Sequence, residues 1–103
     1  MTQYTDNFSW LLQKFNTVMD KHQDLGKALR NAGPINDKDS QLIQLSAAAA
    51  LRAEGAVHSH VKRALQAGAS AEEIYHTVIL LTSTIGFPAV AAALSWCRET
   101  IEK

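Results

Sequence analysis

The strongest constraint on the fold of this chain is the stretch over residues 46–70, which reads SAAAALRAEGAVHSHVKRALQAGAS. Its alanine run favours helix, and we expect that helix to break at Glu54-Gly55 before another begins. Around the break, Ala53, Ala56 and His60 are spaced three and four residues apart, which places them on one helix face. Any chemistry at this face therefore involves the three positions together.

Helical periodicity continues through the rest of the chain. The first helix is expected to start after Thr5 or Asp6, and Gly26 is a position where it could kink or end. Later start signals are the caps Asn36 or Asp37, and a capping box from Ser70 to Glu73. We expect helices over about residues 6–31, 36–52, 55–67, 71–83 and 88–102. No segment alternates like a strand, so the predicted fold class is all-α.

The helix expected at residues 71–83 is apolar around most of its circumference. This stretch and the residues just after it contain Ile74, Tyr75, Val78, Ile79, Leu80, Leu81 and Ile85. A helix of this kind is covered on all sides. In a domain of 103 residues we expect the second covering surface to come from another subunit.

The composition narrows the choice of partners and compartment. Ten basic and ten acidic residues give no net charge, so we expect neither a nucleic acid nor an anionic membrane as a partner. The single cysteine, Cys97, excludes an internal disulfide. No signal peptide and no apolar run of about 20 residues is visible, so we expect a cytoplasmic protein.

Four segments share a pattern that is typical of one protein family. They are Lys38 with Leu42-Ile43, residues 60–64 (HVKRA), residues 67–74 (AGASAEEI), and Gly86-x-Pro88. On these segments the chain resembles the alkylhydroperoxidase D-like/carboxymuconolactone decarboxylase superfamily over residues 35–96. The resemblance implies a five-helix or six-helix orthogonal bundle that assembles into a homotrimer or homohexamer. It also implies one domain over residues 1–103, with an N-terminal helical arm at 1–33 and the family core at 35–103.

Redox members of the superfamily carry a C-x-x-C-x-x-x-H run at this point. Here the histidine is present as His60, but Ala53 and Ala56 occupy the cysteine positions. The glutamate that relays protons in those members would lie twelve residues before Ala53, at Gln41. Alanine has no nucleophile and the glutamine amide does not titrate, so we expect no thiol chemistry at this site. We interpret Cys97, on a different helix, as a small buried hydrophobe.

The decarboxylase branch also lacks the two cysteines and keeps the histidine. The resemblance therefore implies acid/base work on a lactone carboxylic acid. We predict His60 and Glu54 as catalytic residues, and Gln41 and Arg52 as contacts for a small carboxylated ligand, with no cofactor.

The sequence does not predict a metal site. His58 and His60 are two positions apart, so on a helix their side chains point about 200° apart and cannot share an ion. We expect His58 to be exposed or at an interface. The structural alternative for His60 is a buried imidazole hydrogen-bonded to Gln41 or Gln44, with no reaction.

Three function classes remain. The first is a lyase-like or isomerase-like acid/base enzyme centred on His60. The second is a non-catalytic oligomeric binding or scaffolding protein that has lost the redox thiols, in which Phe87 or other side chains would fill the pocket. The third and weakest is an alkylhydroperoxidase-type antioxidant, against which Ala53 and Ala56 count.

Overall fold

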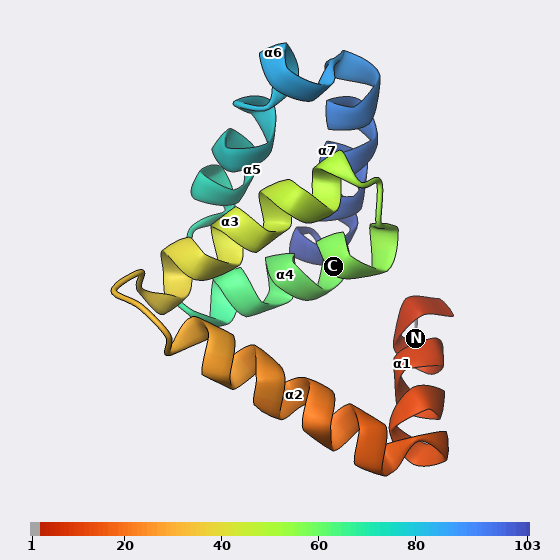
Figure 1. Cartoon of the computed structure of the whole chain (residues 1–103). Coiled ribbons are helices and arrows are strands. Elements are labelled where there is room, and N and C mark those ends of the chain that lie inside the picture. The colour runs from red at the N-terminus through yellow and green to blue at the C-terminus, as the bar shows by residue number, and fades with distance from the viewer. Residues whose placement is uncertain (1–2) are drawn as a thin grey trace. The chain divides into compact units, whose positions relative to one another are not determined.

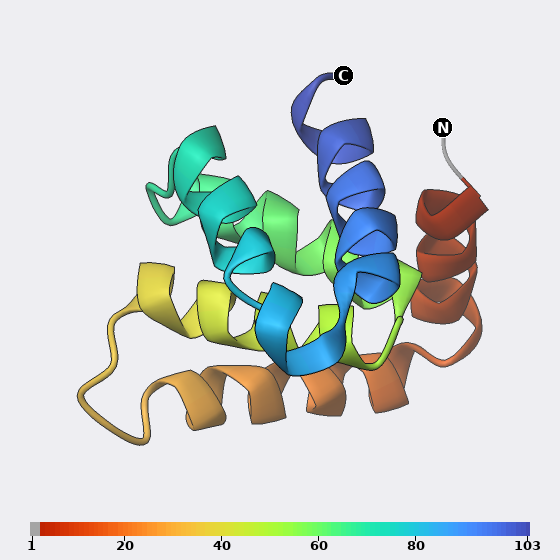
Figure 2. The same ribbon diagram turned by 90° about the horizontal axis from the view of Figure 1, so that it is seen from above.

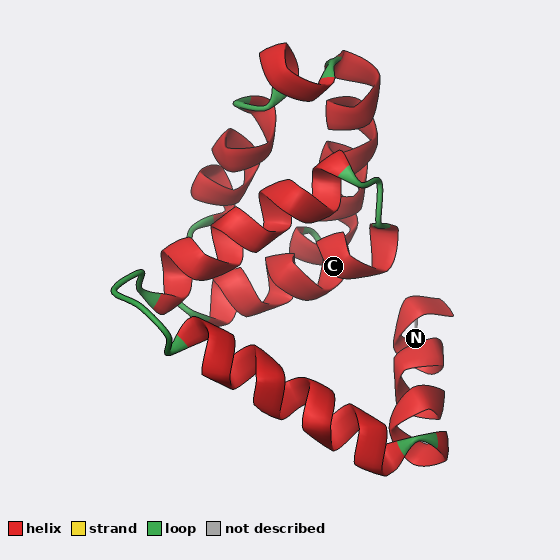
Figure 3. Cartoon of the chain, viewed as in Figure 1, coloured by secondary structure: helices red, strands yellow, loops and turns green. Residues whose placement is uncertain are grey.

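The computed structural model describes residues 3–103, and its side chains from residue 6 onward. Within this range the chain is helical and contains no strand (Figure 3). The helices are α1 (Gln3–Lys14), α2 (Asn16–Arg30), α3 (Asp37–Ala50), α4 (Glu54–Gln66), α5 (Ala71–Ile79), α6 (Thr82–Ile85) and α7 (Phe87–Ile101). They form two compact units, the first ending at Ile35 and the second comprising Asn36–Lys103. The predicted all-α class is confirmed.

The first unit contains two helices where one was expected. Helix α1 already includes Gln3, and the chain breaks at Phe15, whose backbone leaves the helical region (φ −123°, ψ 51°). The break accompanies an edge-to-face contact between the rings of Trp10 and Phe15, with centroids 5.9 Å apart. Gly26, by contrast, lies inside α2 and does not end it. The prediction of one helix from Thr5 or Asp6 was therefore wrong.

The second unit holds the hydrophobic core. Helices α3 and α4 pack against each other, and α7 packs on both α4 and α5 (Figures 1 and 2). Their facing sides supply the buried residues Leu45, Ala48, Ala49, Val57, Val61, Ala64, Ile74, Val78, Val90, Ala93 and Cys97. Several of these are alanine, which lets neighbouring helix backbones approach closely. The core thus holds α4, with its two histidines, between α3 and α7.

The connection between α3 and α4 is a Schellman motif with an unusual residue. Arg52 adopts the left-handed conformation (φ 53°). The N–H of Ala53 donates to the carbonyl of Ala48 (3.0 Å), and that of Arg52 donates to the carbonyl of Ala49 (3.1 Å). Helix α3 therefore ends at Ala50, and Gly55 lies in the first turn of α4. The predicted break at Glu54-Gly55 was wrong, because a non-glycine residue makes the turn.

The predicted starts of α3, α5 and α7 are confirmed. The Asn36 side chain accepts a hydrogen bond from the backbone N–H of Asp39 (2.8 Å). Ser70 and Glu73 form the reciprocal capping box at the start of α5, with bonds of 3.0 and 2.9 Å. Pro88 lies in the first turn of α7, as predicted.

The apolar helix after Ser70 is shorter than expected. Helix α5 ends at Ile79 instead of Ser83, and the hydroxyl of Thr82 donates to the freed carbonyl of Ile79 (2.7 Å). The short helix α6 then leads to α7 (Figure 1). Ile79 is 45% exposed and Leu80 is 63% exposed, so this region is not covered on all sides within the chain.

Candidate functional site

The fold brings together the glutamine and the histidine that were predicted from distant parts of the sequence. Gln41 lies in the second turn of α3 and is buried, with 5% of its surface exposed. His60 lies in the second turn of α4 and is half-buried. Its Nδ1 atom is 2.8 Å from Oε1 of Gln41. The other candidate partner, Gln44, instead donates to the carbonyl and hydroxyl oxygens of Ser40.

This hydrogen bond determines the tautomer of the His60 ring. The amide oxygen of Gln41 can only accept, so Nδ1 of His60 carries the proton and donates it. In the neutral ring Nε2 is then the basic nitrogen. A buried amide on one helix therefore orients a half-exposed imidazole on the next, as a residue that positions a general base would do.

The face around His60 is lined with small side chains. Ala53 caps α4 and Ala56 lies in its first turn, and both are partly buried. Arg52 is exposed on the connection just before them. Neither alanine carries a nucleophile, so the face has no counterpart of the redox dithiol.

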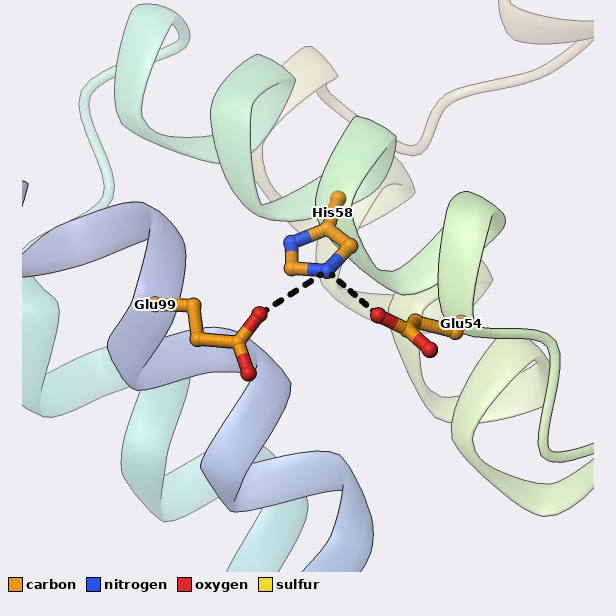
Figure 4. A group of neighbouring side chains, drawn as sticks. All are labelled: Glu54, His58 and Glu99. Carbon is orange, nitrogen blue, oxygen red and sulfur yellow. Dashed lines mark hydrogen bonds and ion pairs between the residues drawn. The ribbon is translucent and has the colours of Figure 1, made fainter. Parts of the chain in front are cut away.

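The structure places Glu54 with His58. The Glu54 carboxylate lies 3.3 Å from Nε2 of His58, and the Glu99 carboxylate of α7 lies 3.5 Å from the same atom (Figure 4). Glu54 and His60 are six positions apart, or about 120° around an α-helix. The pairing of Glu54 with His60 thus receives no support from this geometry.

His58 itself is more enclosed than predicted. Its side chain is only 12% exposed, and its Nδ1 lies 2.7 Å from the hydroxyl of Thr100. Of the two options for His58, exposure is wrong, because α7 packs on this side of α4. The option of a subunit interface stays a prediction. The spacing of Glu54 and His58 is visible in the sequence, but Thr100 and Glu99 reach them only through tertiary packing.

The remaining candidates lie apart from this face. Burial raises the pKa of the Cys97 thiol to about 12, so it stays protonated and a poor nucleophile. The first unit contains an open hollow, lined by residues 12–18 at the turn between α1 and α2. None of the predicted site residues contributes to that hollow. No helix in residues 3–103 has the length and apolar character needed to cross a membrane.

These features define a small all-helical protein that presents an oriented histidine near the start of α4. The chain matches the model of the Carboxymuconolactone decarboxylase family over residues 17–99, and it belongs to this family. The match begins inside α2, earlier than the resemblance seen from residue 35 onward. No curated protein and no solved structure gives a significant match to the chain.

Proposed function

We propose that this protein is a small-molecule acid/base enzyme, lyase-like or isomerase-like, with His60 as its proton-transfer group. One observation carries the proposal. The Nδ1 atom of His60 donates to the buried amide oxygen of Gln41 at 2.8 Å, which directs the chemistry to Nε2. Membership of the Carboxymuconolactone decarboxylase family supports a ligand of the lactone carboxylic acid type.

The reaction requires His60 to take a proton from the substrate and return it. Nε2 accepts the proton, and the resulting imidazolium keeps its Nδ1–H bond to Gln41. The Gln41 amide cannot exchange a proton, so it serves as a positioning residue. An imidazole suits this task because its ordinary pKa of about 6.5 lies near neutral pH. General acid/base catalysis of this kind contributes roughly 10²–10⁴-fold to a rate.

The substrate is proposed to be a small carboxylate that enters beside Ala53 and Ala56. Their methyl groups leave room where the redox members carry sulfur. The exposed guanidinium of Arg52 lies on the connection that leads into Ala53, and it is proposed to hold the substrate carboxylate. Phe87 is 60% exposed, so in the isolated chain it does not act as a plug for an internal pocket. Dithiol peroxidase activity is not part of the proposal, because the His60 face carries no thiol.

The protein is also proposed to self-associate. Ile79, Leu80 and Phe87 lie along the α5–α6–α7 connection, and each is at least 45% exposed. Large exposed apolar side chains are often found at contact surfaces between subunits. The same surface would serve a non-catalytic scaffold, so self-association alone does not distinguish that alternative from the enzyme.

Substrate screening with variants tests the enzyme proposal. Small lactones and unsaturated dicarboxylates are titrated while the histidine resonances are followed by NMR, and turnover of any ligand is then measured. His60→Gln should keep the fold and lower kcat/KM by about a hundredfold or more. Gln41→Leu should lower kcat and alter its pH profile, because the ring loses the acceptor that defines its tautomer.

The matched control is His76→Gln, which removes an exposed histidine on α5. It should leave turnover unchanged. The enzyme proposal fails if no ligand perturbs the His60 resonances and if His60→Gln differs from the parent only in stability. That outcome would identify His60 as a structural core residue of a scaffold.

A further inference from the structure

A second cluster of polar side chains lies between α4 and α7, apart from the Gln41–His60 pair. Glu54 and His58 are one turn apart on α4, and Glu99 approaches them from α7 (Figure 4). One nitrogen or oxygen atom from each residue can be chosen so that all three atoms lie within 4.8 Å of one another. His58 is only 12% exposed, whereas the two carboxylates are about half exposed. The His58 ring is therefore held by its surroundings, whereas the more exposed side chains of Glu54 and Glu99 can move to adjust their positions.

The distances in this cluster suit a shared ion better than a direct ion pair. Charge-assisted N–H···O bonds are usually about 2.7–2.9 Å long. Nε2 of His58 is 3.3 Å from Glu54 and 3.5 Å from Glu99. With bonds of about 2.0–2.2 Å, neighbouring ligand atoms of a tetrahedral zinc site are roughly 3.3–3.5 Å apart. The two separations from Nε2 match edges of such a tetrahedron, and the two carboxylates offer oxygen atoms within 4.8 Å of each other.

Thr100 provides the outer contact that metal-bound histidines usually have. Its hydroxyl is 2.7 Å from Nδ1 of His58. A hydroxyl can accept as well as donate, so it can hold the ring in place whether Nε2 bears a proton or a metal ion. With a metal on Nε2, Nδ1–H of His58 donates to Thr100, which is the usual way that a ligating imidazole is oriented.

The chemistry of the three donors indicates which ion would bind. Two carboxylates neutralise the charge of a divalent cation. One imidazole nitrogen favours first-row transition metals and Zn²⁺ over Mg²⁺ and Ca²⁺, which prefer oxygen ligands only.

We propose that Glu54, His58 and Glu99 form a site for a divalent first-row metal ion, with Zn²⁺ as the ion to test first. Three protein ligands leave a fourth position for water or for a further ligand. The ion would join the first turn of α4 to the last turns of α7. The site is independent of the acid/base proposal, because His58 and His60 point about 200° apart on α4.

Metal titration of the intact chain tests the proposal. Thermal unfolding is followed with and without Zn²⁺, and binding is measured by calorimetry. An ion that binds only the folded chain, at a hundredfold excess over its Kd, should raise Tm by about 10–20 °C in a domain of this size. Mg²⁺ at the same concentration should change Tm little. Co²⁺ should bind competitively with Zn²⁺ and give the visible absorption of a four-coordinate site.

Each variant is compared with its own metal-free form, so that a change in basal stability does not affect the result. His58→Gln and Glu99→Gln should each abolish the rise in Tm. The matched controls His76→Gln and Glu72→Gln remove exposed groups of α5 and should keep it. A Zn²⁺ response that survives in His58→Gln, or that does not saturate below millimolar concentration, overturns the proposal.

Discussion

The thiol of Cys97 has no exposed surface in the second unit. Burial disfavours the charged thiolate and raises its pKa to about 12, from an ordinary value of 9.0. Reactivity follows the thiolate, so the native thiol is unreactive near neutral pH. Burial therefore makes Cys97 a structural residue of the hydrophobic core.

We predict that Cys97 reacts with a thiol reagent at pH 8 far more slowly in the native protein than in denaturant. A Cys97→Ser variant should keep any native activity. Labelling at equal rates in the folded and unfolded states would contradict this account, as would hydroperoxide turnover that tracks oxidation of Cys97.

The same shift determines how pH affects stability through this residue. Folding raises the pKa of the Cys97 thiol. Its contribution to the free energy of unfolding is therefore fully present below pH 9 and declines toward pH 12. The unfolded thiol loses its proton first, which favours unfolding. Compared with Cys97→Ala, the parent protein should therefore lose free energy of unfolding as pH rises above 9. Urea denaturation of both proteins across this range measures the difference.

At the scale of the element, the ends of α3 and α4 use the same motif with different residues. Arg52 after α3 and Gly68 after α4 both have positive φ, of 53° and 98°. In each case the following residue donates to a carbonyl five positions back, at 3.0 and 2.9 Å. Glycine adopts this conformation without steric cost, whereas other residues pay about 1–2 kcal/mol. The α3 end therefore stores strain that the α4 end does not.

We predict that Arg52→Gly keeps the fold and changes the free energy of unfolding by less than about 1 kcal/mol. Relief of the strained backbone offsets the extra flexibility of glycine in the unfolded chain. Arg52→Val should destabilise by more, because a β-branched residue fits this conformation poorly. Urea denaturation of the two variants measures both effects. An equal loss of free energy of unfolding in both variants would show that the Arg52 side chain, and not its backbone conformation, makes the main contribution to stability.

The same Arg52→Gly variant bears on ligand binding. If the guanidinium holds the substrate carboxylate, KM rises while the stability stays near that of the parent. This one variant therefore distinguishes two roles of Arg52. Its stability measures the effect on the backbone, and its KM measures the effect on ligand binding.

At the scale of the whole molecule, the apolar side chains of the α5–α6–α7 connection support the proposed assembly. Leu80 is the C-cap of α5 and is 63% exposed, and Phe87 is the first residue of α7 and is 60% exposed. Both adjoin helices whose other faces are buried in the core. Leaving such groups in water costs free energy that a subunit contact recovers, at about 25 cal/mol per Å² of apolar surface.

We predict that the protein sediments as an oligomer at micromolar concentration and that Leu80→Glu shifts it toward the monomer. The matched control is Glu72→Gln, an exposed change on α5 that removes no apolar surface. Sedimentation velocity measures both. A stable, folded monomer of the parent at micromolar concentration would contradict the prediction.

Features that depend on neighbouring residues can be predicted from the sequence. The caps at Asn36 and Ser70 and the Pro88 start of α7 are correct in the structure, because each depends on hydrogen bonds or backbone angles within one turn. The same holds for the all-α class, which follows from helical periodicity. The pairing of His60 with Gln41 was anticipated as one of two options, since the family pattern places both residues near one site.

The exact positions of two helix breaks, and the contacts between distant segments, could not be predicted from the sequence. No glycine or proline marks a break at Phe15, and the glycine signal near Arg52 is displaced to Gly55, yet Phe15 and Arg52 are the residues that leave the helical conformation. Glu54 and His58 are neighbours on one helix, but Glu99 and Thr100 join them only because α7 packs on α4. Periodicity identifies which face of a helix is buried. Which partner covers that face depends on the packing of the whole core.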